Sequence, residues 1–148
     1  HATLSASIRR PILVLDPTLR IPATAALLRD PNTVLVCLND TDRALPAQTL
    51  AMPSDGHGRI DLAALLRQLA QMDCHEVLVE CGATLAAAFV GQRLVDEIVL
   101  YAAPVMLGAD ARSLLRLANI DSMRDRIEMR VVDVRHIGDD IRITCIPK

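Results

Sequence analysis

The chain has 148 residues, of which 51% are hydrophobic, 23% charged and 1% aromatic, enough apolar material for one globular domain with its own core. The 16 basic and 18 acidic residues give a net charge of -2, and the two aromatic residues are too few for a stacking platform, so no nucleic-acid partner is expected. The apolar runs are too short to span a membrane and the N-terminus lacks the apolar segment of a secretory signal, so we expect a cytoplasmic protein.

The first part of the chain alternates short apolar runs with turn residues. Residues 1–10 are polar and unpatterned, and we expect them to be frayed. Continuous apolar runs at 12–15 and 33–38 predict buried strands, because strands covered on both faces do not alternate. A helical turn is expected over 23–29, and a weaker strand over 49–52.

A capped helix is the clearest element of the chain. Asp61 is a typical N-cap residue, and the helix that it begins is expected to end near Met72. The apolar positions in between repeat at the spacing of one helix face: Leu62, Leu65, Leu66 and Leu69. Residues 77–79 then predict a third buried strand, and residues 85–90 a short helix terminated by Gly91.

The last part of the chain predicts a strand over 98–103, a helical turn over 112–117 and a terminal hairpin. Residues 127–137 and 141–146 alternate apolar and charged side chains around Gly138, which is typical of a β-hairpin with one solvated face. Because strands and helices alternate before this hairpin, the predicted fold is α/β, a largely parallel sheet with an antiparallel edge.

Motifs for metal binding and for nucleophilic or nucleotide chemistry are missing. The cysteines form no C-x-x-C pair and no histidine pair has zinc-finger spacing, so we expect no metal site. Glycine-rich dinucleotide, P-loop and nucleophile-elbow motifs are absent as well. We expect reduced, structural cysteines: Cys37, Cys74, Cys81 and Cys145. The histidines lack a positioned partner and are expected to be structural or solvated: His57, His75 and His136.

Ligand chemistry is expected at the junction between strand 77–79 and helix 85–90. In open α/β sheets, ligands bind beyond the carboxyl ends of the strands, where helix N-termini face the crevice. Gly82 lets the backbone approach a ligand, and the N–H groups of residues 82–85 suit a phosphate. Glu80 could accept hydrogen bonds from sugar hydroxyls. On these residues alone, a plain turn at Gly82 with a solvated Glu80 is an equally good interpretation.

Several segments, taken in order, resemble one family. Residues 77–86 read VLVECGATLA, which resembles the VEGGxTLxxxF signature of the C-terminal reductase domain of the bifunctional riboflavin-biosynthesis deaminase/reductase. The chain continues to agree with the family after this signature, at residues 94–97, 101–104 and 107–112. Before it, residues 14–22 resemble the family's VLDSxLRxP segment, and residues 60–62 resemble the start of one of its helices. The resemblance therefore covers nearly the whole chain.

The resemblance implies a dihydrofolate-reductase-like fold and an NADPH-dependent reductase. The implied reaction reduces the ribose of 5-amino-6-(5-phosphoribosylamino)uracil to a ribityl chain in riboflavin biosynthesis. Glu80 would contact the sugar of this phosphorylated ribosylamino-pyrimidine, and no catalytic residue is assigned. Backbone N–H groups at the helix start would hold the cofactor: Gly82, Ala83, Thr84, Leu85 and Ala86. The parent enzymes imply a homodimer, which exposed sheet edges would also favour.

The chain departs from the family pattern at three points. Cys81 stands where the family has Gly or Ala, and Pro17 replaces a Ser that follows Asp16 in the family segment. The family's domain also begins earlier, so we expect residues 1–148 to be a single reductase domain that is N-terminally truncated and lacks the first strands. The H-x-E and P-C-x-x-C pattern of a zinc deaminase is absent, so deamination is excluded for this chain. The resemblance implies that a deaminase domain lies upstream in the parent chain.

Two other interpretations remain open at the level of the sequence. One is another reductase of the dihydrofolate-reductase-like fold, which the signature around Glu80 disfavours. The other is a non-catalytic module that keeps the fold for assembly or for binding a small ligand, which the missing first strands and Pro17 keep open.

Overall fold

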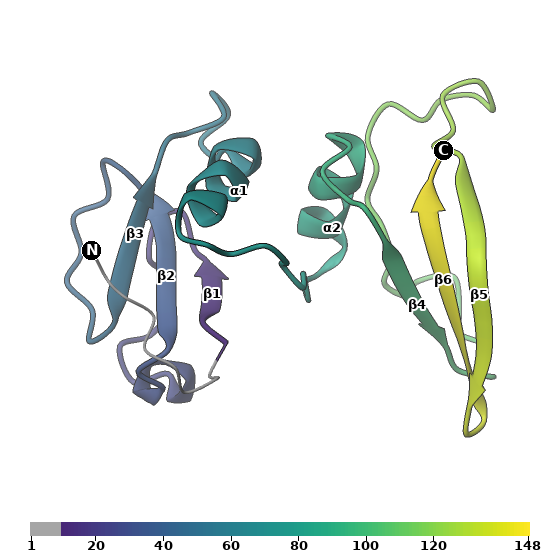
Figure 1. The fold of residues 1–148 in the computed structure, drawn as a ribbon, viewed down its shortest axis with the longest axis horizontal. Coiled ribbons are helices and arrows are strands. Elements are labelled where there is room, and N and C mark those ends of the chain that lie inside the picture. Colours follow the sequence, from purple (N-terminus) through teal and green to yellow (C-terminus); the bar gives the residue numbers. More distant parts are fainter. Residues whose placement is uncertain (1–9) are drawn as a thin grey trace. The chain divides into compact units, whose positions relative to one another are not determined.

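The computed structural model describes residues 10–148, so the frayed start expected for residues 1–10 lies almost wholly outside the described residues. The chain divides into two compact units, His1–Glu76 and Val77–Lys148, here called unit 1 and unit 2 (Figure 1). Each unit has its own three-stranded sheet. The single domain expected over residues 1–148 stays a prediction.

Unit 1 is built on a parallel sheet. Its strands β1 (Ile12–Leu15), β2 (Thr33–Leu38) and β3 (Gln48–Met52) lie in the order β1-β2-β3. The 3₁₀ helix η1 (Ala26–Arg29) precedes β2, and helix α1 (Leu62–Gln71) follows β3 (Figure 1). The structure confirms the strands and the capped helix predicted for this unit. The helical turn expected over 23–29 is also confirmed, but it is shorter and covers only Ala26–Arg29.

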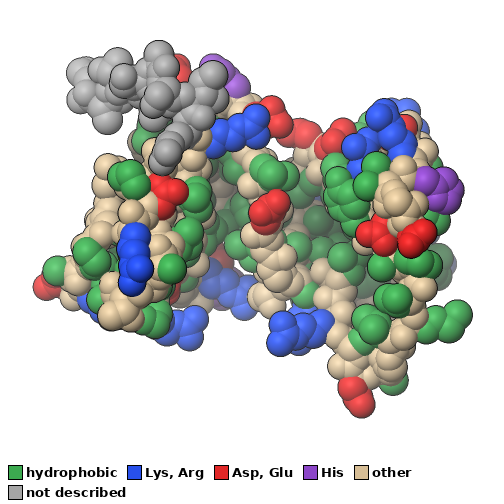
Figure 2. Space-filling view, turned by 90° about the horizontal axis from the view of Figure 1, so that it is seen from below, with side chains coloured by type: hydrophobic (Ala, Val, Ile, Leu, Met, Phe, Trp, Pro, Cys, Tyr) green, Lys and Arg blue, Asp and Glu red, His purple; other side chains and the backbone are tan. Residues whose placement is uncertain are grey.

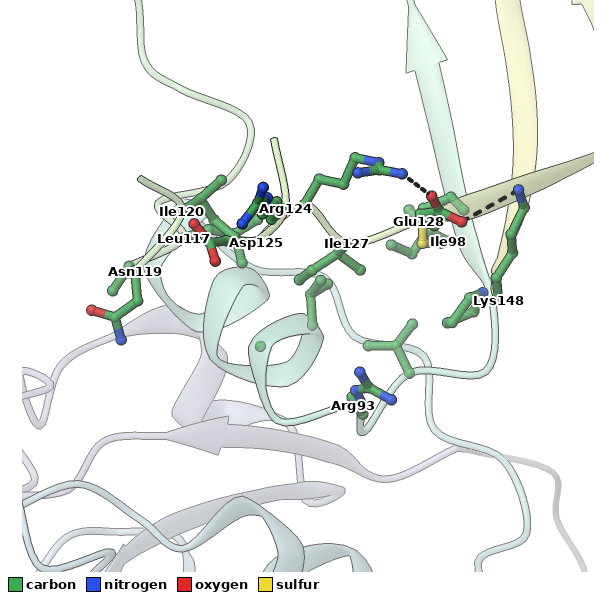
Figure 3. A pocket seen from close by; sticks show the side chains of 17 residues that line it. Arg93, Ile98, Leu117, Asn119, Ile120, Arg124, Asp125, Ile127, Glu128 and Lys148 are labelled. Carbon is green, nitrogen blue, oxygen red and sulfur yellow. Dashed lines mark hydrogen bonds and ion pairs between the residues drawn. The ribbon is translucent and has the colours of Figure 1, made fainter. Parts of the chain in front are cut away.

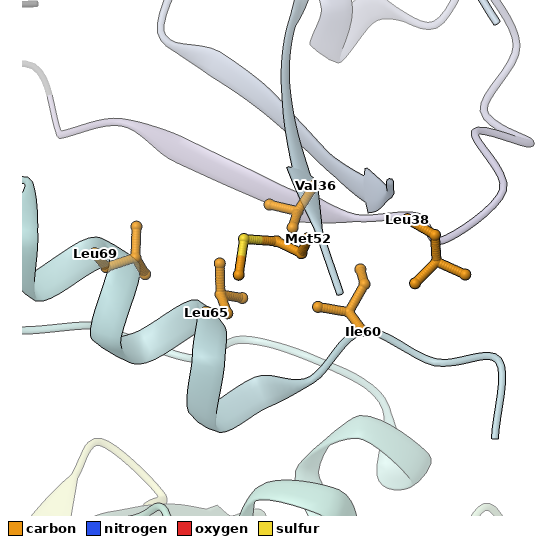
Figure 4. Packing of buried hydrophobic residues seen from close by; sticks show 6 residues of the cluster. All are labelled: Val36, Leu38, Met52, Ile60, Leu65 and Leu69. Carbon is orange, nitrogen blue, oxygen red and sulfur yellow. The ribbon is translucent and has the colours of Figure 1, made fainter. Parts of the chain in front are cut away.

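The core of unit 1 explains why β2 is apolar without alternation. Val36 and Leu38 belong to a cluster that also contains Leu65 and Leu69 of α1 (Figure 4). The intervening residues of the strand belong to a second buried cluster on the other side: Leu35 and Cys37, with Leu19 and Leu28. Because successive side chains point to opposite faces of a sheet, both faces of β2 are covered.

Helix α1 begins as its sequence predicts. The Asp61 carboxylate accepts a hydrogen bond from the Ala64 N–H at 2.9 Å, which satisfies one of the first N–H groups of the helix. At its other end, Met72 caps the helix and Asp73 takes a left-handed backbone conformation with φ +60°.

Unit 2 is built on an antiparallel sheet next to helix α2 (Ala83–Gly91). Its strands β4 (Ile98–Ala102), β5 (Met129–Ile137) and β6 (Asp140–Pro147) lie in the order β4-β6-β5. The predicted hairpin is confirmed, with Gly138 at φ +63° in its turn. One face carries a polar network in which Asp133 binds Arg142 at 2.9 Å and Arg135 at 2.7 Å, as expected for a solvated face.

Two predicted elements are wrong. Residues 77–79 form no strand, and Leu78 is 74% exposed, because no neighbouring strand pairs with this backbone within the described chain. Residues 112–117 form no helical turn. The Arg116 N–H donates to the Ala83 carbonyl at 3.1 Å, and so it is not used in an i to i−4 bond within its own segment.

The end of α2 also differs from the expectation. Gly91 is the last helical residue and does not supply the left-handed turn that a terminating glycine would. Instead, Gln92 caps the helix and Arg93 adopts the left-handed conformation, with φ +56°. No helix in the described part of the chain is long and apolar enough to cross a membrane.

Candidate functional site

The start of α2 has hydrogen-bond donors that no residue in the described range, 10–148, accepts from. Gly82 is the N-cap residue and provides no side-chain acceptor, and no acidic residue lies in the first turn. The first intrahelical bond joins the Ala86 N–H to the Gly82 carbonyl at 3.1 Å. The N–H groups before it, those of residues 83–85, have no acceptor among residues 10–148. Free N–H groups at the positive end of a helix dipole are the kind of donors that bind an anion.

The backbone at Gly82 is accessible from outside. Gly82 has an ordinary extended conformation, with φ −78° and ψ 168°, so the glycine is not needed for a left-handed turn. A Cβ atom added there would meet nothing within 4 Å. The space over the first turn of α2 is therefore open, and a phosphate-bearing cofactor fits the donors that face it.

Glu80 and Cys81 precede this helix start in an exposed segment without regular structure. The Glu80 carboxylate has no ion pair or hydrogen bond among the described residues, so it is available to sugar hydroxyls. Partial desolvation of its sulfur raises the pKa of the exposed Cys81 thiol, and the Ala86 N–H offsets part of that effect. The thiol is therefore protonated at neutral pH, which does not favour a nucleophilic role. We refer to residues 80–86 as the α2 corner.

The structure adds one residue that the sequence did not single out. The hydrogen bond from Arg116 to the Ala83 carbonyl brings the loop before β5 to the first turn of α2. The Arg116 guanidinium is exposed and makes no ion pair with a described residue. Nothing in the sequence could have indicated this contact, because it joins positions 33 residues apart through a loop without periodicity.

The family segment at residues 14–22 forms a structural turn in unit 1. The Asp16 carboxylate accepts the Ile21 N–H at 2.8 Å, and the Pro17 carbonyl accepts the Thr41 hydroxyl at 2.9 Å. Asp16 is thus engaged in holding the turn. Burial raises the pKa of the neighbouring Cys37 thiol, with a smaller contribution from the Asp16 charge.

The remaining candidates supply no second site. The four cysteines are free thiols, as expected for reduced cysteines; Cys37 and Cys145 are buried, and Cys81 is exposed. The exposed His57 lies in a loop where its backbone N–H binds the Asp55 carboxylate at 2.8 Å. Within residues 10–148, no three His, Cys, Asp or Glu side chains gather in a way that could hold a metal ion.

Comparisons with known sequences agree with the resemblance. Residues 7–143 match the family described as RibD C-terminal domain. The riboflavin biosynthesis protein RibD of Escherichia coli (strain K12) is 32% identical over 139 residues, covering 91% of this chain and 38% of that protein. The 5-amino-6-(5-phosphoribosylamino)uracil reductase of Buchnera aphidicola is 25% identical and covers 92% of this chain and 67% of that protein. The chain thus spans well under half the length of the Escherichia coli relative.

Solved structures show the same fold. The RibD structure of Acinetobacter baumannii superposes with a TM-score of 0.78 at 29% identity and covers 92% of this chain and 37% of that one. The riboflavin biosynthesis reductase of Saccharomyces cerevisiae superposes with a TM-score of 0.72 at 13% identity, covering 94% of this chain and 69% of that one, and supports the fold alone. The predicted α/β, dihydrofolate-reductase-like class is confirmed.

Proposed function

This chain belongs to the RibD C-terminal domain family, and from that premise we propose that it acts as a reductase in riboflavin biosynthesis. The substrate is 5-amino-6-(5-phosphoribosylamino)uracil, whose ribose is reduced to a ribityl chain, and the cofactor is NADPH. The observation that carries this proposal is the set of unused N–H donors at the start of α2, directly after the unpartnered Glu80. Both lie in the segment that resembles the family signature.

In this proposal the α2 corner binds the cofactor through its backbone. The N–H groups of Ala83, Thr84 and Leu85 donate to a cofactor phosphate, and the open space at Gly82 lets that phosphate come close. Ala86 and Gly82 hold the first turn together through their own hydrogen bond. When bound, NADPH supplies the hydride, and the residues of the chain supply binding and orientation.

Glu80 orients the substrate in this proposal. Its carboxylate accepts hydrogen bonds from the sugar hydroxyls and so fixes the carbon that is reduced. A carboxylate that pairs with none of the described residues is suited to this role, because binding the sugar breaks no ion pair among them.

The substitution Glu80→Gln tests the proposal. It keeps the size of the side chain and removes its charge, and we expect turnover of the ribosylamino-pyrimidine, followed by the loss of NADPH absorbance, to fall by about 100-fold. The matched control is Glu76→Gln, another exposed carboxylate just upstream, which should leave turnover unchanged. Full activity in Glu80→Gln, or no turnover by the unsubstituted chain, would contradict the proposal and favour a non-catalytic module.

We also propose that the chain forms a homodimer. In unit 2 the strands β4 and β5 are sheet edges, and β5 exposes the apolar side chains of Val131, Val132 and Val134. Hydrophobic side chains reach the molecular surface among charged ones (Figure 2). Long, apolar edge strands favour pairing with another chain. A monomeric elution volume in size-exclusion chromatography across micromolar concentrations would contradict the dimer.

The upstream deaminase domain and the cellular location of the protein both stay predictions. The RibD relatives are much longer than this chain, and a deaminase domain upstream in the parent protein is what the resemblance implies. A cytoplasmic location stays a prediction in the same way.

A further inference from the structure

The first turn of α2 has little of its own to hold it in place. Gly82, the N-cap residue, has no side chain that could bind the first N–H groups, and the turn contains no acidic residue. The helix begins with the hydrogen bond from the Ala86 N–H to the Gly82 carbonyl, at 3.1 Å. Helix ends of this kind fray. Contacts from outside the helix therefore decide how precisely the donors of this turn are held.

The loop before β5 makes such a contact. The Arg116 N–H donates to the Ala83 carbonyl at 3.1 Å, in the first turn of α2. The loop then continues beside the helix, where Leu117 and Ile120 line a pocket together with Val90 of its last turn (Figure 3). The loop is thus anchored to both ends of α2, and the Arg116 N–H is held against the first turn.

The carbonyl that Arg116 binds belongs to the same peptide group as the Thr84 N–H. A peptide group is planar and trans, so its carbonyl and its N–H point in opposite directions within one plane. Holding the Ala83 carbonyl therefore fixes the direction of the Thr84 N–H, which is one of the unused donors of the α2 corner. Hydrogen bonds on the two sides of one peptide group also strengthen each other, because each polarises the group in the same sense.

We propose that Arg116 is a positioning residue for the cofactor phosphate, and that it acts through its backbone N–H on the Thr84 donor. The inference rests on the proposed function, since it takes the cofactor as the ligand of the α2 corner. The Arg116 guanidinium has no part in it, because this group is exposed and pairs with no residue of the range 10–148. Binding of the cofactor should therefore depend on the backbone at this position and tolerate a change of side chain.

Two variants of the same residue test the proposal by fluorescence titration with NADPH. Arg116→Pro removes the N–H, whereas Arg116→Gln keeps it and removes the charge. We expect the dissociation constant to rise at least about fivefold in Arg116→Pro and to stay within about twofold in Arg116→Gln. The matched control is Arg112→Pro, in the same loop, where the lost N–H has no backbone acceptor within residues 10–148. Unimpaired binding by Arg116→Pro, or an equal loss in Arg116→Gln, would overturn the proposal.

Hydrogen exchange separates positioning of the donor from a general role in stability. In the free protein, the Ala86 amide should exchange faster in Arg116→Pro than in Arg112→Pro, because the first turn of α2 opens more often. Faster exchange together with unimpaired NADPH binding would show that Arg116 supports only the helix, and would overturn the proposal.

A second way of removing the donor covers the case that Arg116→Pro does not fold, as judged by circular dichroism. The α-hydroxy acid analogue of leucine, introduced at position 116, replaces the N–H by an ester oxygen without the restrictions of proline. Its reference is Arg116→Leu, which has the same side chain and keeps the N–H. Weaker NADPH binding by the ester is expected, and equal binding by the two would overturn the proposal.

Failure of the proposed function gives a different result from failure of this inference. If the unsubstituted chain does not bind NADPH, the cofactor site itself is contradicted, and the role of Arg116 is overturned with it. If the unsubstituted chain and Arg116→Pro bind NADPH equally well, only the role of Arg116 is overturned.

Discussion

The two units of this chain bury their apolar residues to very different extents. Of the fourteen hydrophobic residues that are buried within residues 10–148, eleven lie in unit 1, including Leu35 and Val36 at 0% exposure, and three lie in unit 2. Unit 2 instead exposes large side chains, such as Tyr101 at 64% and Val134 at 58%. Unit 1 is thus held by its own core, whereas unit 2 carries the exposed surfaces that a substrate, a cofactor or a second copy can cover.

The two helices show the same contrast at their N-termini. In α1, the Asp61 side chain uses one of the first N–H groups, so this end is completed within the protein. In α2, Gly82 offers no side chain and the first donors are unused. The same backbone feature therefore stabilises unit 1 and is available for binding in unit 2.

The largest effect expected from this contrast concerns the cores. Leu35→Ala removes a fully buried side chain between the sheet and the turn of unit 1, and should lower the free energy of unfolding by about 3 kcal/mol. In unit 2, Leu78→Ala truncates an equally large side chain that is 74% exposed, and should change the free energy of unfolding by less than about 0.5 kcal/mol. Urea unfolding of both variants measures the difference, and equal losses would remove the contrast between the units.

A second prediction concerns the helix starts. Asp61→Ala removes the acceptor for the Ala64 N–H and should lower the free energy of unfolding by about 1 kcal/mol. Gly82→Asp adds a carboxylate at the start of α2, where it would satisfy the unused donors and should stabilise the fold slightly while preventing anion binding. Thermal unfolding of the two variants measures the expected changes in stability, and NADPH titration measures the expected loss of anion binding. Unimpaired NADPH binding by Gly82→Asp would contradict the proposed use of these donors.

The secondary structure of unit 1 could be predicted from the sequence more fully than that of unit 2. In unit 1, the strand runs and the Asp61 cap are local patterns that tertiary contacts support, and the structure confirms them. In unit 2, the expected strand at 77–79 lacks a partner, and residues 112–117 bind α2 through Arg116 and form no helix. Such contacts between distant segments leave no periodic signal. The position of the α2 corner was predictable, because it depends only on Gly82 and the helix that follows it.

The smallest expected effect is a pH dependence in the solvated face of unit 2. The hydrogen bond from Arg142 lowers the pKa of the Asp133 carboxyl, and the charge of Arg135 lowers it further. A carboxyl whose pKa is lowered in the folded state contributes stability above its ordinary pKa of about 4, and this contribution is lost as the pH falls through the lowered value. Asp133→Asn should therefore flatten the fall in stability below about pH 4. Asp139→Asn, in the hairpin turn, is the control, and equal curves for wild type and Asp133→Asn would contradict this account.

A fluorescence titration of the chain with NADPH and with NADH tests whether the open start of α2 holds the cofactor. We expect saturable binding that favours NADPH, its loss in Gly82→Val, and its retention in Gly91→Val, since an added Cβ at either glycine meets nothing within 4 Å. Circular dichroism confirms that both variants are folded. Binding that survives in Gly82→Val as fully as in Gly91→Val would show that the cofactor lies elsewhere and not at the start of α2.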